Sequence, residues 1–410
     1  MKIDKKHLLN YSILIPYLIL SVLGLIVVYS TTSPTSIQAG GNGFGMVMNQ
    51  GIFWIISLFI IALLYRIRLG FLKKGSILTI VIFAEIILLL LSRFITGTIN
   101  GAHGWLKLGA FSIQPAEYLK IILVWYLAFR FTKRQEEIKV YDYQALTHNH
   151  WFPKAFNDWR TMVAILIGIV AIMPDLGNAT ILFLTVVIMI AVSGIGYRWF
   201  STMLGAIVSV SGLVLTSIWI IGVERVAKIP VFGYVAKRFS AFFNPFKDLS
   251  GSGHQLANSY YAMSNGGWFG LGLGNSIEKR GYLPEAHTDF VFSIVIEEFG
   301  FFGASLILAL LFFLILRIIL VGIRAKNPFN SMMALGIGGM ILMQTFINIG
   351  GISGLIPSTG VTFPFLSQGG NSLLVLSVAI ALVLNIDANE RRDALYEQME
   401  AEAQDQSEEA

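Results

Sequence analysis

The sequence predicts an all-α protein, a polytopic integral membrane bundle of about ten transmembrane helices with one long extracytoplasmic loop. Three observations carry this prediction. Of the 410 residues, 55% are hydrophobic and only 13% are charged, whereas soluble domains carry roughly 25% charged residues. The mean hydropathy is +0.70. Apolar runs of spanning or near-spanning length recur along the chain, and Lys and Arg gather in particular connections between them.

The apolar runs define the expected spans. The first run is too long and too apolar for a typical cleaved leader, and no small-residue cleavage site follows it cleanly, so we expect it to be retained. Ten spans would place both termini on the same side of the membrane. The expected spans are residues 8–30, 48–65, 75–92, 111–131, 161–175, 177–195, 200–222, 289–323, 330–350 and 371–388.

Lys and Arg residues decide the orientation. The connections 31–47 and 351–370 contain neither, so we expect them outside the cell. Both termini are then expected in the cytoplasm, and the loop 223–288 is expected on the outer side. The basic residues expected in the cytoplasm are Lys2, Lys5, Lys6, Arg66, Arg68, Lys73, Lys74, Lys133, Arg134, Lys139, Lys154, Arg160, Arg317, Arg324 and Lys326.

The domain organisation follows from these spans. We expect a single polytopic domain over residues 1–388, followed by an acidic cytoplasmic tail, 389–410, that is a frayed helix or disordered and has no packed role. The chain has no cysteine, which excludes disulfides, thiolate metal sites and Cys nucleophiles. Its six histidines show no HExxH spacing, which disfavours a zinc hydrolase.

The long outer loop is net basic, glycine-rich and aromatic. Its excess of positive charge suits an anionic ligand with an apolar part. The alternative is contact with anionic lipid head groups. Residues 266–274 are dense in glycine, which permits tight turns and lets a ligand approach the backbone; the GxGxG string there lacks the strand–helix context of a dinucleotide site. The basic residues expected to hold an anion are Lys237, Arg238, Lys279 and Arg280.

The segment 281–300 gathers polar residues at the mouth of the eighth span. It contains His287, Thr288 and Asp289, followed about two turns later by Glu297 and Glu298. A carboxylate at that depth is costly unless it is paired or faces a cavity. Asp289, at the predicted water boundary with His287 and Thr288 beside it, is the candidate catalytic carboxylate, with helix capping as the alternative. Glu297 and Glu298 are expected to shape the cavity or to pair with Lys, Lys120 being one candidate.

Further polar segments are expected at the outer face. Residues 100–107 close the third-to-fourth connection and include Trp105. Glu117 and Lys120, three residues apart, can share one helix face, either as an internal salt bridge or as a substrate-facing dipole. Residues 174–177 are expected to be an inter-helix turn rather than a broken helix at a polar cavity. Residues 354–372, uncharged and punctuated by Pro and Gly, are expected to form an ordered re-entrant loop.

This combination suits chemistry or transport on a lipid-linked anion. A carboxylate at the membrane–water boundary can act as a general base toward a sugar hydroxyl. Basic side chains or a divalent ion can stabilise a departing diphosphate. Composition and spacing lead no further than this.

Several motifs together resemble the SEDS family (shape, elongation, division and sporulation), in the same order and over roughly residues 10–390. Each string alone is weak, but the combination is highly specific, and residues 274–287 resemble the division-type members. Four positions depart from the common pattern: Gly104, Ala116, Gln368 and Asn371. The motifs are Gln114–Lys120, Pro174–Gly177, Leu283–Phe290, Gly354–Gly360 and Gly369–Gly370.

The resemblance implies a peptidoglycan glycosyltransferase that polymerises lipid II at the division septum with a cognate class B penicillin-binding protein. Other division membrane proteins are implied as partners, and no nucleic acid is expected. By position in the motifs, Asp289 matches the family's essential acid, and Glu117 and Lys120 match its paired polar residues. We expect His287, Thr288, Glu298, Trp105, Ser367 and Gln368 to bind substrate or support the site.

Two other function classes compete with the enzyme. A lipid II flippase also fits ten spans with intramembrane charges, and a division scaffold fits the membrane bundle but does not require Asp289 or the basic loop. The enzyme is favoured because the polar clusters gather at one face and no inverted-repeat symmetry is evident. A divalent cation, Mg²⁺ or Mn²⁺, is a candidate cofactor.

Overall fold

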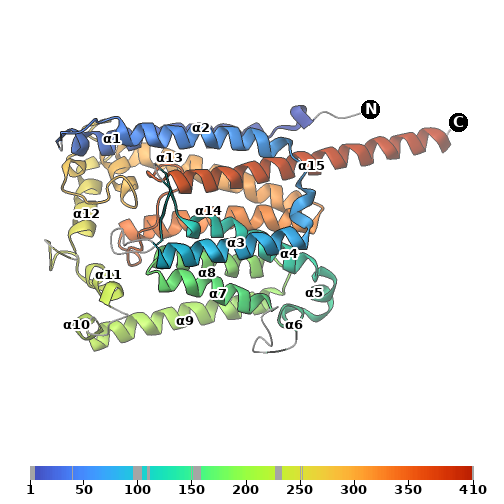
Figure 1. Cartoon of the computed structure of the whole chain (residues 1–410), viewed down its shortest axis with the longest axis horizontal. Coiled ribbons are helices and arrows are strands. Elements are labelled where there is room, and N and C mark those ends of the chain that lie inside the picture. Colours follow the sequence, from blue (N-terminus) through green and yellow to red (C-terminus); the bar gives the residue numbers. More distant parts are fainter. Residues whose placement is uncertain are drawn as a thin grey trace.

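The computed structural model describes residues 5–38, 40–95, 104–108, 111–148, 150, 158–226, 233–249, 251 and 253–408. These residues form a bundle of long, roughly aligned helices (Figure 1). All ten apolar runs contain helices. They are α1 (Tyr11–Gln38), α2 (Gly45–Arg66), α3 (Gly75–Phe94), α4 (Pro115–Thr132), α7 (Trp159–Ile172), α8 (Leu176–Ala191), α9 (Tyr197–Ile221), α13 (Val291–Arg324), α14 (Pro328–Ile352) and α15 (Gly370–Glu408).

Seven of these helices are long and apolar enough to cross a membrane by length and composition. The other three are shorter or more polar: α4 has 18 residues and includes Glu117, Lys120 and Arg130, and α7 and α8 have 14 and 16 residues. The all-helical membrane fold is therefore confirmed. Shorter elements connect the long helices: η1 (Lys5–Leu8), η2 (Leu69–Lys73), α5 (Gln135–Tyr141), α6 (Tyr143–Thr147), α10 (Val223–Val226), α11 (Gly233–Phe243), α12 (His254–Gly266) and η3 (Glu278–Arg280).

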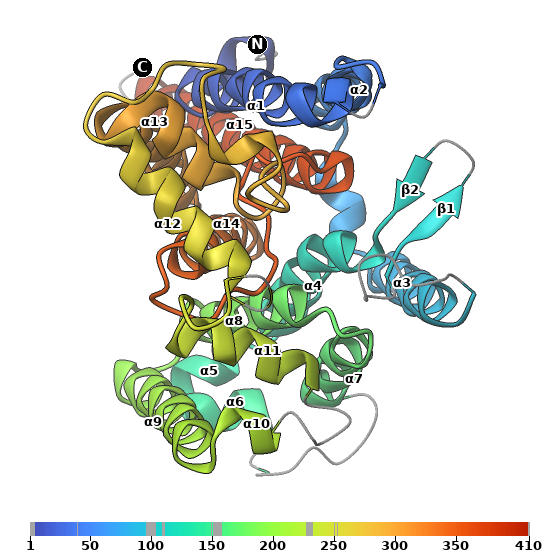
Figure 2. The same cartoon turned by 90° about the vertical axis from the view of Figure 1, so that its left-hand side faces the viewer.

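The two chain ends lie at the same end of the bundle, and the outer-loop helices α10, α11 and α12 lie at the opposite end (Figure 1). This separation agrees with the predicted even number of spans. One small feature was not predicted: an antiparallel hairpin of β1 (Leu106–Leu108) and β2 (Phe111–Ile113), in which Leu106 pairs with Ile113. Figure 2 shows the hairpin projecting beside α3, on the side of the bundle away from α12.

Helix α14 forms the centre of the core. It packs against α4, α8, α13 and α15, and its small residues allow close packing. A Cβ at Gly336 would lie 2.4 Å from Met189 Sδ, and one at Gly339 would lie 2.7 Å from Ile188 Cγ2. Helix α9, by contrast, has no buried residue and lies at the rim (Figures 1 and 2). This close packing holds α14 rigidly, so the segments that pack on its polar end have a fixed support.

Of the two alternatives predicted for the acidic tail, a frayed helix or disorder, the structure has a helix, because α15 continues to Glu408. Residues 389–408 are rich in Ala, Glu, Gln, Leu and Met, which are strong helix formers. The tail also makes contacts that the sequence analysis did not expect. Asn330 Nδ2 donates to Glu390 Oε1 at 2.6 Å, the backbone N–H of Lys326 donates to Glu390 Oε2 at 2.8 Å, and the Lys326 ammonium pairs with Glu397.

The glycine-rich stretch 266–274 has a structural role that differs from the expected ligand contact. Helix α13 is interrupted at Gly300, which has φ +70°. The carbonyls freed there, on Glu297 and Glu298, accept the N–H groups of Leu271 at 2.9 Å and Gly272 at 3.0 Å. The two backbones approach so closely that a Cβ on Gly270 would lie 2.3 Å from the Glu298 carbonyl oxygen. Glycine is required there by backbone packing against α13.

We expect Gly300→Val to destabilise the protein by about 3 kcal/mol or more, because the substitution combines a positive φ with a clash. A Cβ at Gly300 would lie 2.3 Å from the backbone nitrogen of Gly270. Thermal unfolding of the purified variant measures the loss. Gly168→Ala, in α7 with nothing within 4 Å of the added Cβ, is the matched control and should unfold like the wild type. Equal unfolding temperatures for both variants would contradict this account of the kink.

Candidate active site

Asp289 lies in the turn that leads into α13, and the backbone of this turn is fixed by hydrogen bonds to its three consecutive residues 287–289. Three carbonyl oxygens in this turn each accept one hydrogen bond. The backbone N–H of Gln368 donates to His287 at 2.8 Å, the hydroxyl of Ser367 donates to Thr288 at 2.6 Å, and the amide Nδ2 of Asn348 donates to Asp289 at 2.7 Å. The turn is therefore attached along its length to α14 and to the segment 354–370.

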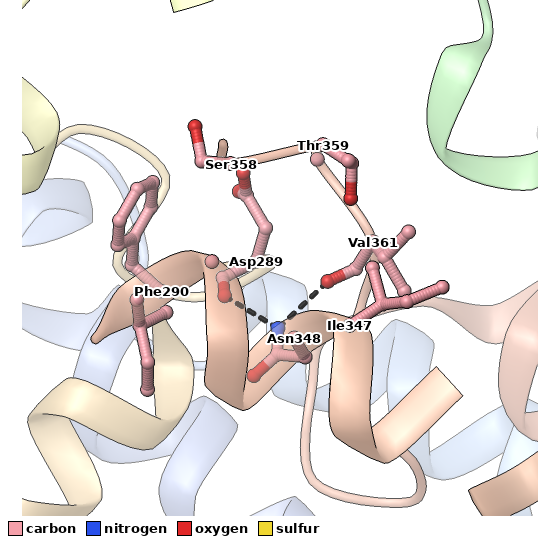
Figure 3. Close-up of a pocket in the computed structure, with 10 residues that line it drawn as sticks. Asp289, Phe290, Ile347, Asn348, Ser358, Thr359 and Val361 are labelled. Atoms are coloured by element: carbon pink, nitrogen blue, oxygen red, sulfur yellow. Dashed lines mark hydrogen bonds between the residues drawn. The ribbon is translucent and has the colours of Figure 1, made fainter. Parts of the chain in front are cut away.

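The Asp289 carboxylate points away from the Asn348 amide, toward Ser358 (Figure 3). Its neighbours set its charge. The Thr288 hydroxyl lies 3.0 Å from Asp289 Oδ1 and 2.8 Å from Glu285 Oε2, so it can donate to either carboxylate. Arg238, on α11, donates to the Ser358 carbonyl at 2.5 Å and acts electrostatically on Asp289. A cation, a hydroxyl and two carboxylates thus meet at the end of the bundle where the outer loop lies.

The pKa of Asp289 reflects these contacts. Burial raises it from its ordinary value to about 6; the hydrogen bond from Thr288 lowers it, the charge of Glu285 raises it, and the charge of Arg238 lowers it. Burial also lowers the pKa of His287, against the opposing charge of Glu285. At pH 7 the Asp289 carboxylate is therefore mostly ionised. Its pKa is nevertheless close enough to pH 7 for the carboxylate to take a proton, as an effective general base requires.

The pair on α4 is an internal salt bridge. Lys120 Nζ lies 2.8 Å from Glu117 Oε1, and both side chains are buried. The Lys120 ammonium also donates to Gln344 Oε1 at 3.4 Å, and Gln344 Nε2 donates to the Thr362 carbonyl at 3.0 Å. Of the two alternatives that the sequence left open, the substrate-facing dipole is not the one observed. Through Gln344, the pair supports the 354–370 segment at Thr362.

The predicted partners of the α13 glutamates are wrong in part, because neither bonds to Lys120. Glu298 pairs with Lys279 at 2.5 Å, and the same ammonium donates to Ser30 on α1 at 2.8 Å. Glu297 accepts the side-chain N–H of Asn265 and the backbone N–H of Ile277, both at 3.1 Å. The loop folds inward against the kink at Gly300, and this brings its own donors to the two carboxylates.

The prediction that Lys279 holds an anion is therefore wrong. Its side chain is 1% exposed and neutralises Glu298, which leaves no access for a phosphate. Arg280, the next residue, is exposed. The side chain of Lys237 lies outside the described residues, as do residues 100–103. Among the predicted basic residues, Arg238 is the one whose described contacts bring it to Asp289.

The remaining predicted residues separate into two groups. Ser367 and Gln368 hold the 287–289 turn, Gln368 through its backbone N–H. Trp105 precedes β1 and is half-buried, and its hairpin is joined to α15 by the bond from Asn371 Nδ2 to the Ser112 carbonyl at 2.7 Å.

The 174–177 segment joins α7 to α8. Asp175 caps α8 by accepting the N–H of Asn178 at 3.1 Å, which agrees with the predicted inter-helix turn.

Sequence reasoning missed two amides on α14, Gln344 and Asn348. They are four residues apart, so they share one helix face, and both are buried. Their spacing in an otherwise apolar run was a usable signal, because buried amides inside a membrane helix need specific partners.

Fold and site together define a polytopic membrane protein with one acidic site at the end of its bundle. The FtsW/RodA/SpoVE family model, described as cell cycle protein, matches residues 11–392. The chain belongs to this family, which confirms the resemblance to the SEDS family.

Curated relatives span nearly the whole chain. A protein of Lactococcus lactis subsp. lactis named probable peptidoglycan glycosyltransferase FtsW is 48% identical over 97% of this chain and 96% of its own. A Bacillus subtilis protein of the same name is 37% identical over 92% of this chain and 90% of its own.

Solved structures share the fold. A chain from a peptidoglycan synthase complex, described as coordinating polymerization and crosslinking, has a TM-score of 0.72 at 23% identity and covers 93% of this chain and 98% of its own. The rod shape determining protein RodA of Thermus thermophilus has a TM-score of 0.63 at 21% identity and covers 93% of this chain and 97% of its own.

We expect Lys279→Ala to destabilise the protein by about 3–5 kcal/mol, because it leaves the Glu298 carboxylate buried without its cation. Thermal unfolding measures this loss. Arg280→Ala, which removes an exposed charge from the next position, should change stability little. The double variant Lys279→Met/Glu298→Leu should recover much of the loss, since it removes both charges. A Lys279→Ala variant as stable as Arg280→Ala would show that the ion pair contributes nothing.

Proposed function

We propose that the protein is a peptidoglycan glycosyltransferase that polymerises lipid II, with Asp289 as its general base. The observation that carries this proposal is the ionisable carboxylate of Asp289, fixed by its backbone at the end of a membrane bundle and accompanied by the Arg238 cation. The family and the names of its relatives supply the reaction class.

The proposed step is a single displacement. The acceptor sugar's hydroxyl oxygen attacks the anomeric carbon of the donor and forms the new glycosidic bond. The bond from that carbon to the diphosphate breaks, and undecaprenyl diphosphate leaves with the electron pair. The hydroxyl proton passes to the Asp289 carboxylate. Attack from the face opposite the leaving group inverts the α-linked donor to a β-linked product.

We assign to Arg238 the role of stabilising the negative charge that develops on the departing diphosphate. A fixed cation aimed at developing charge lowers the barrier of such a step. Across the described residues, no group of three or more His, Asp or Glu side chains could hold a metal ion. The sequence-based expectation of Mg²⁺ or Mn²⁺ stays a prediction, which polymerisation assays with EDTA and re-added metal would test.

We also propose how the chain is oriented in the membrane: both termini lie in the cytoplasm, and the 223–288 loop lies outside the cell. The basic connections lie with the chain ends, as the positive-inside rule requires. A cysteine in place of exposed Asn275 should react with an impermeant thiol reagent on whole cells, and one in place of exposed Gln144 should not. The reverse labelling would overturn this orientation.

The proposed partner is a class B penicillin-binding protein, and the proposed location is the division septum. The structural neighbour from a peptidoglycan synthase complex supports the partner, and the FtsW names of the relatives support the septum. Co-purification in mild detergent tests the first proposal and fluorescence imaging of dividing cells tests the second. Failure of two folded, co-expressed proteins to co-purify, or uniform membrane fluorescence, would contradict them.

We expect Asp289→Asn to lower the rate of lipid II polymerisation by about 10²–10⁴-fold, because the amide keeps the shape but cannot take the proton. Purified protein in detergent with lipid II measures this, and polymer formed without a bilayer also excludes flipping as the sole activity. The exposed Asp248→Asn variant should polymerise normally. In the wild type, activity should fall as the pH drops through about 6, where Asp289 becomes protonated. A near wild-type rate for Asp289→Asn would remove Asp289 from the mechanism.

We expect Arg238→Gln to lower kcat/KM for lipid II by about 10²-fold, because it removes the cation from the leaving diphosphate. Arg238→Lys should retain part of the rate by keeping the charge. Lys247→Gln removes an exposed charge from the same outer loop and should have little effect. If Arg238→Gln and Lys247→Gln behave alike, the diphosphate is held elsewhere.

A further inference from the structure

Asn348 on α14 forms a bridge to two backbone segments, the 287–289 turn and the 354–370 segment, which Ser367 and Gln368 also join directly. Its Nδ2 donates to the carbonyls of Asp289 and Val361, each at 2.7 Å. Figure 3 shows the amide below the turn, with one bond to each segment. One planar –NH₂ group thus joins both the Asp289 peptide and the Val361 peptide to α14.

The base of this bridge is rigid. Asn348 is buried on α14, the helix at the centre of the core. Gln344, one turn earlier, holds the neighbouring Thr362 carbonyl and is itself held by Lys120. The two amides therefore hold consecutive peptides, 361 and 362, from a single helix face. Loss of the Asn348 amide would remove the bond to the Asp289 carbonyl, while the Gln344 contact and the bonds from Ser367 and Gln368 to the preceding two residues stay in place.

The effect on Asp289 is one of position, since the amide touches its backbone and not its carboxylate. A general base must lie within hydrogen-bond reach of the proton it removes, and a misplacement of about 1 Å in an active site can cost 10²-fold in rate. We propose that Asn348 is a positioning residue for the transfer reaction, holding Asp289 at the height where its carboxylate meets the acceptor hydroxyl. This inference rests on the proposed function.

The test compares Asn348→Ala with Asn385→Ala. Asn385 is an equally buried amide on α15 that also donates to backbone carbonyls, those of Tyr65 at 3.2 Å and Ile67 at 2.8 Å. It lies near the basic connections rather than near Asp289. Both variants lose buried amide–carbonyl bonds, and Asn385→Ala also loses the bonds that the Asn385 Oδ1 accepts from Lys5 and Asn389. Asn385→Ala should therefore lose at least as much thermal stability as Asn348→Ala. Asn348→Ala alone should lower kcat for lipid II polymerisation, by about 10²-fold, with KM little changed.

The pH profile supplies a second readout that a merely structural role would not move. Among the described residues, Glu285 from its own turn and Arg238 from α11 are the ionisable groups whose charges act on Asp289, while α14 and the 354–370 segment present uncharged residues to it. Asn348→Ala changes none of these charges. Without the Asn348 bond, more water should reach the Asp289 carboxylate, and this lowers its pKa. The acidic limb of the activity profile should therefore move to lower pH.

Asn348→Ser, which keeps one donor, should retain an intermediate rate and serves if the Ala variant does not fold. The inference is overturned if folded Asn348→Ala or Asn348→Ser keeps a near wild-type kcat and the same acidic limb, or if Asn385→Ala loses kcat to the same extent. Those results would leave the proposed function intact as long as the wild type polymerises lipid II and Asp289→Asn does not. Failure of the wild type to polymerise would instead contradict the proposed function itself.

Discussion

The hydrogen bonds between the 287–289 turn and the 354–370 segment are the constraint on which the site depends. Irregular backbone at the edge of a membrane bundle must find partners within the protein, because lipid supplies none. Here two irregular segments, more than sixty residues apart in sequence, satisfy one another. Asn348 and Ser367 supply side-chain donors, and Gln368 supplies a backbone donor. These bonds fix the Asp289 peptide, from which the Asp289 carboxylate extends.

Two buried ion pairs make this arrangement possible by supporting it from different sides. Glu117–Lys120 lies behind the 354–370 segment and reaches it through Gln344. Lys279–Glu298 joins the outer loop to α13 and, through Ser30, to α1. Burying charges costs desolvation energy that the pairing offsets only when geometry and further hydrogen bonds are good. Such pairs specify which segments meet, and here they fix the loop and the segment that flank Asp289.

The sequence predicted the helical membrane fold because hydropathy and span length are local properties that the bilayer imposes. It also singled out Asp289, whose position at a span mouth is readable from a short string. The pairing of Lys279 was not readable, because the inward fold of the outer loop depends on the kink at Gly300 and its close contact with Gly270. Asn348 was missed for a related reason: an amide in an apolar run has no assigned partner until the chain folds. The tail contacts were not readable either, because they join Glu390 to Lys326 and Asn330, which are some sixty residues away in the sequence.

The most direct measurement is the structure of the protein with lipid II bound at its acceptor position. The decisive quantity is the distance from the reacting hydroxyl oxygen to the nearer Asp289 carboxylate oxygen. The account predicts about 2.6–3.2 Å, the reach of a general base, with the turn still bonded to Asn348. A reacting hydroxyl that lies against another acid, with Asp289 beyond the reach of a hydrogen bond or of one bridging water, would contradict it.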